Sequence, residues 1–284
     1  MKTYRELLFS HVDELEDNQV AKLLLFELCQ EKDINLYLDL DEEVDADIYQ
    51  RYEEGIKRLL KQEPLAYILG YRWFYGYKFK VNQDTLIPRD ETEELVAYIL
   101  STLDEYFDGK EVIKCADIGT GSGNIALSLL KEEKKIEMIA TDISDKALAL
   151  AKENSENLDV KCEFMLGDML KPLIENNKKV DILISNPPYI PKNEEIEVSV
   201  KDYEPNIALF GGEDGLQYYR ELLANASKVL NDKAFIFFEI GWNQKEEITN
   251  LAKQYFPDSL IEVKKDINGK NRMFRLEYNS GGER

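Results

Sequence analysis

From about residue 89 onward, the sequence alternates short apolar strands with amphipathic helices, and this pattern restricts the fold more than any other feature of the chain. Residues 112–117, 136–141 and 180–185 are among the segments that read as strands, and segments with helical spacing of their apolar residues separate them. Strands joined through helices pair in parallel, because each connection must cross the face of the sheet. The sequence therefore predicts an α/β fold with a doubly wound, mostly parallel sheet.

The C-terminal segment departs from this alternation. Residues 260–265 and 272–278 read as two strands that flank Asn268-Gly269, a dipeptide typical of tight hairpin turns. Because a hairpin joins antiparallel neighbours, we expect one antiparallel strand in the otherwise parallel sheet.

The first part of the chain has a different character. Residues 1–70 carry apolar side chains at helical spacing and predict a small helical bundle. Residues 71–88 are aromatic and alternating, which predicts a linker β-hairpin. The remaining residues, 89–284, would then form the α/β domain.

Composition limits the possible functions. The net charge of -20 argues against tight binding to nucleic acid, which depends largely on Lys and Arg neutralising phosphates. The three cysteines are scattered and the single histidine, His11, lies near the N-terminus, so neither a metal site nor a histidine-based triad is expected. No apolar run approaches about 18 residues and no signal-like start is present, which predicts a cytoplasmic protein without a membrane partner. Nothing in the sequence indicates an oligomer, so we expect a monomer.

A glycine-rich turn follows the first strand of the α/β part. Gly119, Gly121 and Gly123 would let the backbone approach a ligand closely at the start of a helix. The spacing is G-x-G-x-G, which differs from the G-x-G-x-x-G of dinucleotide-binding proteins. Asp142 ends the next strand, 19 residues after Gly123, where a carboxylate can accept hydrogen bonds from ribose hydroxyls. A tight turn with an incidental aspartate is the alternative, and the combination favours nucleoside binding.

The strand over residues 180–185 runs directly into Asn186-Pro187-Pro188-Tyr189. In open α/β sheets, ligands bind at the carboxyl ends of the strands, where this tetrapeptide lies. The prolines fix the backbone and remove two N–H donors, so a carbonyl there can face a ligand beside the side-chain oxygen of Asn186. Two acceptors side by side match the two N–H groups of a planar NH2, and Tyr189 offers a flat face to a planar group.

Together these two elements resemble the class I S-adenosylmethionine-dependent methyltransferases that methylate planar NH2 groups. That branch includes adenine-N6 and cytosine-N4 DNA methyltransferases and a protein-glutamine methyltransferase. The sulfonium cofactor supplies the electrophile in such chemistry. The resemblance implies that Asn186 and the Pro187 carbonyl hold both N–H groups and aim the nitrogen lone pair at the methyl group.

More of the chain resembles the peptide chain release factor glutamine methyltransferase family. The matching segments are residues 64–70, 74–81, 86–93, 117–123, 141–144, 167–168, 186–190 and further short motifs that end at Arg272. Residues 86–93 resemble the family signature Ile-Pro-Arg-Pro-Glu-Thr-Glu, with Asp90 standing where the family usually has proline.

This resemblance implies a seven-stranded class I methyltransferase fold whose helical domain docks the substrate protein. The implied reaction moves a methyl group from S-adenosyl-L-methionine to the N5 amide of the glutamine in the Gly-Gly-Gln motif of class I release factors, in translation termination. The implied catalytic residues are Asn186, Pro187 and Tyr189, and the implied substrate-binding residues are these three with Pro188. The implied cofactor-binding residues are Gly119, Gly121, Gly123, Asp142, Asp168 and Asn186.

Two acidic residues each allow two interpretations. Asp168 stands where such folds approach the adenine of the cofactor, or it is the N-cap of a helix and precedes Met169 and Leu170. Glu239 is a charge at the end of a strand near the expected cleft, or a carboxylate buried against a partner.

Two other functions remain open from the sequence. An adenine-N6 or cytosine-N4 nucleic-acid methyltransferase would share the NH2 chemistry, but the charge of -20 and the absence of a basic domain argue against it. A non-catalytic S-adenosylmethionine-binding module would act through protein contacts. It would not need the tetrapeptide Asn186-Pro187-Pro188-Tyr189, called the Asn186 motif below.

Overall fold

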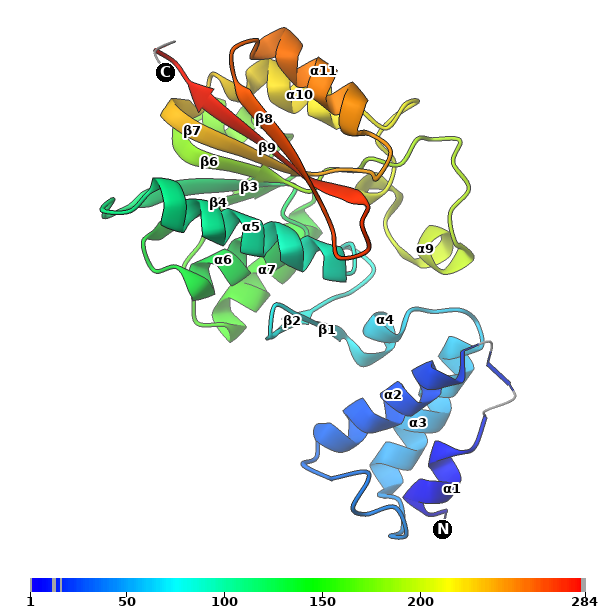
Figure 1. Ribbon diagram of the computed structural model, residues 1–284. Coiled ribbons are helices and arrows are strands. Elements are labelled where there is room, and N and C mark those ends of the chain that lie inside the picture. Colours follow the sequence, from blue (N-terminus) through cyan, green and yellow to red (C-terminus); the bar gives the residue numbers. More distant parts are fainter. Residues whose placement is uncertain (1, 12–13, 16, 282–284) are drawn as a thin grey trace. The chain divides into compact units, whose positions relative to one another are not determined.

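A computed structural model describes residues 2–11, 14–15 and 17–281 (Figure 1). The chain divides into two compact units. One comprises the described part of Met1–Tyr71 together with Ile196–Tyr203, and the other comprises Arg72–Glu195 with Glu204–Arg284 up to residue 281. In the described part of the chain, no helix is both long and apolar enough to cross a membrane.

The first unit is helical, which confirms the predicted bundle. Its helices are α1 (Tyr4–Leu8), α2 (Asn18–Gln30), α3 (Ala46–Leu59), α4 (Leu65–Leu69) and α9 (Val198–Tyr203). The Asp45 side chain starts α3 by accepting hydrogen bonds from the first free N–H groups of that helix. Helices α2 and α3 approach closely at Gly55, where a Cβ would lie 2.5 Å from Leu24 Cδ2. Residues of α1, α2, α3 and α4 form an apolar core of this unit.

The expected linker hairpin is present at the start of the second unit. Strands β1 (Tyr71–Phe74) and β2 (Tyr77–Lys80) pair through a turn at Tyr75 and Gly76, both with positive φ. Such a turn matches the twist of the two strands. Phe74 and Phe79 pack edge to face and are buried in the core beneath α5.

One seven-stranded sheet forms the centre of the second unit. Its strands are β3 (Ile113–Ile118), β4 (Ile136–Asp142), β5 (Glu163–Leu166), β6 (Val180–Ser185), β7 (Leu230–Glu239), β8 (Leu260–Lys265) and β9 (Asn271–Asn279). The spatial order is β5-β4-β3-β6-β7-β9-β8. Strands β3 to β7 pair in parallel, and β9 is antiparallel to both of its neighbours. The predicted fold class is therefore confirmed, including the antiparallel strand.

Helices cover both faces of this sheet (Figure 1). One face carries α5 (Asp90–Tyr106), α6 (Asn124–Glu132) and α7 (Asp145–Asn157), and the other carries α10 (Gln217–Ala226) and α11 (Lys245–Tyr255). Two shorter helices, α8 (Lys171–Glu175) and the 3-10 turn η1 (Asn206–Ala208), belong to loops.

Residues along β7 alternate between two apolar cores. Ile236 and Phe238 pack with α10 and α11, whereas Phe235 and Phe237 pack with α5 and α6. Successive side chains of a strand point to opposite faces, so a strand covered on both sides needs apolar residues at every position. This requirement explains the uninterrupted apolar runs in β6 and β7.

The end of α10 differs from what the local sequence predicts. The apolar spacing of residues 218–230 predicts a helix as far as Leu230, but α10 ends at Ala226 and Leu230 is the first residue of β7. Leu230 pairs with Val180 of β6, and the Val180 N–H donates to the Val229 carbonyl. The pairing with β6 therefore overrides a helical pattern that local sequence alone would extend.

Asp90, which stands where the sequence resemblance expects proline, is the first residue of α5. Proline suits this position because its fixed φ is helical and its missing N–H is not needed there. Aspartate suits it for another reason, since its charge faces the positive end of the helix dipole. Asp90 also pairs with Arg72 of β1. The substitution therefore preserves the start of the helix.

Candidate active site

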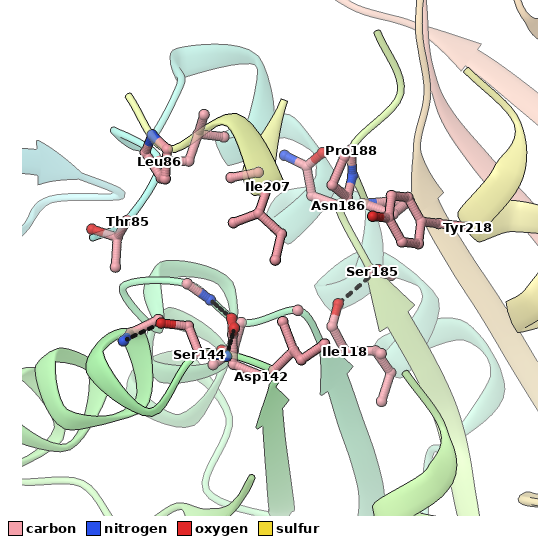
Figure 2. Close-up of a pocket in the computed structure, with 18 of the residues that line it drawn as sticks. Thr85, Leu86, Ile118, Asp142, Ser144, Ser185, Asn186, Pro188, Ile207 and Tyr218 are labelled. Carbon is pink, nitrogen blue, oxygen red and sulfur yellow. Dashed lines mark hydrogen bonds between the residues drawn. The ribbon is translucent and has the colours of Figure 1, made fainter. Parts of the chain in front are cut away.

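A cavity of about 290 Å³ lies at the carboxyl ends of β3, β4 and β6 (Figure 2). Figure 2 shows Asp142 and Ser144 on one side of the cavity and Asn186 and Pro188 on the other, with Ile207 pointing into the space between. All of its lining residues belong to the second unit. The two sequence motifs thus line one cavity, as their position after parallel strands predicts.

The three glycines of the turn after β3 all have positive φ, at +72° for Gly119, +56° for Gly121 and +82° for Gly123. A Cβ built on Gly119 or Gly121 would meet no heavy atom within 4 Å, so the turn leaves open space at these two positions. A Cβ on Gly123 would lie 2.9 Å from Leu127 Cδ1 in α6. The first two glycines therefore leave room for a ligand, and the third allows the helix to pack against the turn.

Asp142 lines the cavity at the end of β4, where the sequence placed it. Its carboxylate accepts hydrogen bonds of 2.9 Å from the N–H groups of Gly121 and Ser144. Burial raises the pKa of Asp142, and these backbone donors oppose the shift. Two accepted bonds leave about two of the four lone-pair sites of a carboxylate for a ligand hydroxyl pair.

Asp168 also lines the cavity. It does not cap α8, because that helix has Leu170 at its N-cap position and no side-chain capping bond. The Asp168 carboxylate instead pairs with Lys171, and about a third of its side chain is exposed. This arrangement is compatible with a ligand contact, and the adenine-side role stays a prediction.

Asp117, the residue that opens the glycine motif, is buried directly beneath the turn and only 1% exposed. Thr120 Oγ1 donates a 2.6 Å hydrogen bond to Oδ2, whereas Oδ1 has no hydrogen-bond partner among the described residues. Burial, with the nearby Asp142 charge, raises the pKa of Asp117 to about 7, and the Thr120 hydroxyl and the Ala126 N–H dipole oppose this. The site therefore holds a carboxyl group that changes charge near neutral pH.

The Asn186 motif divides between the cavity and the core. Asn186, Pro187 and Pro188 line the cavity, and Asn186 Nδ2 donates to Thr92 Oγ1 at 3.5 Å. Tyr189 lies outside the lining, and its ring packs against the core that contains α10 and α11. Direct contact of the Tyr189 ring with a planar substrate group therefore stays a prediction that these contacts do not support.

Two residues that line the cavity, Thr92 and Ile207, were not assigned a role from the sequence. Thr92 of α5 links Asn186 to Glu239, and Ile207 of η1 enters the cavity although its side chain is 55% exposed. Thr92 lies inside the signature over residues 86–93, so this motif could have pointed to Thr92 as a site residue. Nothing in the local pattern around Ile207 distinguishes it from other exposed apolar residues.

A buried ion pair joins two walls of the cavity. Glu204 accepts hydrogen bonds from the Arg89 guanidinium and from the Ile87 N–H, and its side chain is only 1% exposed. The pair ties the segment before α5 to the segment before η1. Removing Arg89 would leave the buried Glu204 charge without its partner, which is the costly way to break such a pair.

Comparison with known proteins identifies the family. A model described as "Methyltransferase small domain" matches residues 90–202, and one described as "PrmC N-terminal domain" matches residues 6–70. The release factor glutamine methyltransferase of Bacillus anthracis is 39% identical over 92% of this chain and 93% of its own length. The Bacillus subtilis protein of the same name is 39% identical over 90% of both chains.

The chain belongs to the release factor glutamine methyltransferase family. This confirms the resemblance seen in the sequence motifs, and it makes the protein an enzyme that uses S-adenosylmethionine. The catalytic domain of hMettl16 in its solved structure has a TM-score of 0.54 at 15% identity, over 72% of this chain and 76% of that one. At that identity the likeness supports the fold alone.

The residues of this cavity fit the family cofactor. The open space at Gly119 and Gly121 and the unused acceptor sites of Asp142 suit a nucleoside with ribose hydroxyls. When bound, S-adenosylmethionine supplies the electrophilic methyl group. The turn and Asp142 would hold this cofactor, and Asn186 and Pro187 line the same cavity.

If Asp142 accepts hydrogen bonds from the ribose hydroxyls of the cofactor, its substitution should selectively weaken cofactor binding. In Asp142→Asn, one acceptor becomes a donor and the charge is lost, so S-adenosylmethionine should bind about 10-fold to 100-fold more weakly, at about 1.5–3 kcal/mol for a charged hydrogen bond. Isothermal titration calorimetry would measure this change. Asp145→Asn, which alters an exposed carboxylate in the first turn of α7, should bind normally. Equal affinity for both variants would contradict the assignment.

The buried Asp117 predicts how stability depends on pH. Its pKa is about 7 when folded, against an ordinary 3.8, so the folded protein binds the extra proton and the free energy of unfolding falls as the pH rises through this range. Between pH 5 and pH 8, wild type should lose about 3 kcal/mol more than Asp117→Asn, at about 1.4 kcal/mol per unit.

Urea unfolding at the two pH values, without cofactor, measures this difference. The control is Asp108→Asn, which changes an exposed carboxylate after α5 and should keep the wild-type pH dependence. An identical pH dependence in wild type and Asp117→Asn would show that Asp117 ionises normally.

Proposed function

We propose that this protein transfers the methyl group of S-adenosylmethionine to the N5 amide of the glutamine in the Gly-Gly-Gln motif of class I peptide chain release factors. Relatives that carry the name release factor glutamine methyltransferase, at 35% to 39% identity over about nine-tenths of the chain, support the substrate class. The observation that carries the proposal is that Asn186 and Pro187 line the same cavity as Asp142 and Gly121. Acceptor group and methyl donor would then meet inside one enclosed site.

The chemistry follows from the weakness of the nucleophile. The lone pair of an amide nitrogen is delocalised into its carbonyl group, so the nitrogen reacts poorly unless it is oriented and its N–H groups are held. Asn186 Oδ1 and the Pro187 carbonyl would accept the two N–H groups and aim the nitrogen at the methyl carbon. No histidine base is needed for this orientation.

The backbone of the motif supports this assignment of acceptors. The Tyr189 carbonyl accepts from Gln244 Nε2 at 3.0 Å, and the Pro188 carbonyl is packed against Gly211, where a Cβ would lie 2.5 Å away. In the described chain, no group donates a hydrogen bond to the Pro187 carbonyl. That carbonyl therefore has its hydrogen-bonding capacity available for a substrate amide.

A transfer assay tests the proposal. Purified protein, S-adenosylmethionine and a class I release factor are mixed, and mass spectrometry should find one added methyl group on the Gly-Gly-Gln glutamine. Asn186→Ala should lower kcat by about 100-fold or more, because it removes a preorganised acceptor, and it should weaken cofactor binding far less, because the glycine turn and Asp142 remain. Asn157→Ala, at the exposed end of α7, is the matched control.

A release factor with alanine in place of that glutamine, and an oligonucleotide, complete the experiment. Neither should be methylated. Transfer to the oligonucleotide without transfer to the release factor would replace the proposal by a nucleic-acid methyltransferase. Cofactor binding without transfer to any substrate would indicate a non-catalytic S-adenosylmethionine-binding module.

We further propose that the helical unit docks the release factor. This unit has its own core, matches the N-terminal family model over residues 6–70, and contributes no residue to the cavity lining among the residues described. Its role is therefore separable from cofactor binding. The proposed enzyme acts as a monomer, since one chain supplies both cavity walls, and it acts in the cytoplasm with its translation-termination substrate.

Removal of residues 1–70 tests the docking role. Loss of only about 1.4 kcal/mol of docking energy would raise KM for the intact release factor about 10-fold. A short Gly-Gly-Gln peptide lacks the docked surface, so its kcat/KM should be the same for the full and shortened proteins. Equal damage to peptide methylation and cofactor affinity would indicate a structural role instead.

A further inference from the structure

Glu239 ends β7 beside the cavity and is only 2% exposed. Its Oε2 accepts a 2.6 Å hydrogen bond from Thr92 Oγ1, and its Oε1 lies 3.5 Å from the Tyr189 hydroxyl. Glu239 does not line the cavity, whereas Thr92 and Asn186 do. Burial of a carboxylate is costly unless the group is hydrogen-bonded or paired, so these contacts decide its charge state.

The proton of Thr92 has a defined direction. An ionised carboxylate can only accept hydrogen bonds, so the single hydroxyl proton of Thr92 must point to Glu239. Toward Asn186 the Thr92 oxygen then offers a lone pair alone. The amide end that faces Thr92 at 3.5 Å must therefore be the NH2 group, as in the structure.

The orientation of Asn186 decides what a substrate would meet. With Nδ2 directed to Thr92, Oδ1 is the end left for a substrate, and no group in the described chain donates to it. Reversing the amide would present N–H groups to the N–H groups of a substrate amide, an arrangement without a hydrogen bond. While Glu239 is ionised, the hydrogen bonds of Thr92 therefore favour this orientation of the Asn186 amide.

We propose that Glu239, acting through Thr92, is a positioning residue that holds the Asn186 amide with its oxygen toward the substrate nitrogen. The inference rests on the proposed function, because it explains how one of the two acceptors of the substrate NH2 keeps its polarity. It also assigns Thr92 a role as the relay between the two side chains.

Other groups around Glu239 act on its charge from several elements. Arg272 of β9 stabilises the ionised form, and Glu91 of α5 opposes it. Tyr189 lies between Arg272 and Glu239, with its hydroxyl 3.4 Å from Arg272 Nη1. The Tyr219 hydroxyl of α10 donates to the backbone carbonyl of Glu239 at 2.7 Å and leaves the carboxylate to the other groups.

This arrangement makes the polarity dependent on pH. Burial raises the pKa of Glu239, and the hydrogen bond from Thr92 and the charge of Arg272 oppose the shift. A protonated Glu239 can donate to Thr92, which is then free to donate to Asn186 and reverse its amide. The rate of transfer should therefore be highest above the pKa of Glu239 and should decline as the pH falls through that pKa. Because the pKa is raised, this decline should begin at a higher pH than for an ordinary glutamate.

Three variants and one control test the relay in the release-factor assay. Thr92→Val removes the hydroxyl and Thr92→Ser keeps it, while Glu239→Gln keeps the shape and loses the enforced polarity. Thr102→Val is the control, because Thr102 is a buried residue of the same helix whose hydroxyl bonds only within α5, to the Tyr98 carbonyl. Thermal unfolding and cofactor calorimetry accompany every variant.

Thr92→Val and Glu239→Gln should lower kcat about 10-fold to 100-fold, as expected for a misplaced reacting group, with cofactor affinity and KM close to wild type. Thr92→Ser should recover most of the lost rate, and Thr102→Val should match wild type. The decline of kcat at acid pH should be present in wild type and absent in Glu239→Gln.

Three results would overturn the inference. Wild-type kcat in both Thr92→Val and Glu239→Gln would show that the polarity needs no relay. An unchanged acid decline in Glu239→Gln would assign the titration to another group, and parallel losses of cofactor affinity and kcat would indicate a structural role. Absence of transfer by the wild-type protein would overturn the proposed function itself, so the two failures are distinguishable.

Discussion

The parallel pairing of β3 with β4 on one side and β6 on the other is the constraint on which the site depends. Parallel strands end at the same edge of a sheet, so the segments that follow them meet there although they are far apart in sequence. Hydrogen bonds across the strand ends keep this edge in register: Gly119 and Thr120 donate to the Thr141 carbonyl at 2.9 Å, and Ser185 donates to the Ile118 carbonyl at 2.7 Å. The glycine turn, Asp142 and the Asn186 motif are held by these pairings, and the two apolar cores on either face make the sheet a rigid support for them.

Asp117 and Glu239 are buried at this edge and Asp142 is partly buried, and each carboxyl group accepts hydrogen bonds from its immediate surroundings. Thr120 donates to Asp117, two backbone N–H groups donate to Asp142, and Thr92 donates to Glu239. In all three, burial raises the pKa. Such charges lower stability when isolated, which is why perturbed carboxyl groups concentrate at functional sites rather than in ordinary cores. Here Asp142 lines the cavity, and Asp117 and Glu239 lie next to residues that line it, Thr120 and Thr92.

The motif residues show how far local sequence can predict a site. Asp142 could be placed because a carboxylate at a strand end is constrained by the strand itself, and the glycines because a close approach needs them. Tyr189 was expected to face a substrate, yet its ring packs into the core and its hydroxyl lies near Glu239 and Arg272. The direction of a side chain after a proline pair depends on which neighbouring element offers space, and that neighbour, β9, is more than eighty residues further along the chain. Thr92 and Glu239 could not be joined from the sequence for the same reason, since 147 residues separate them.

The sequence by itself determined the class of fold, the ligand-facing motifs and the family, because apolar periodicity, glycine spacing and proline pairs act through local backbone geometry. The start of α5 is also set locally, since Asp90, like a proline, suits the first turn of a helix. Only the tertiary structure decided which end of the Asn186 amide is turned to the protein, which carboxyl groups are buried, and that Arg89 and Glu204 join two cavity walls. These features depend on contacts between distant segments, and the polarity of a hydrogen-bond network exists only when all of its members are in place.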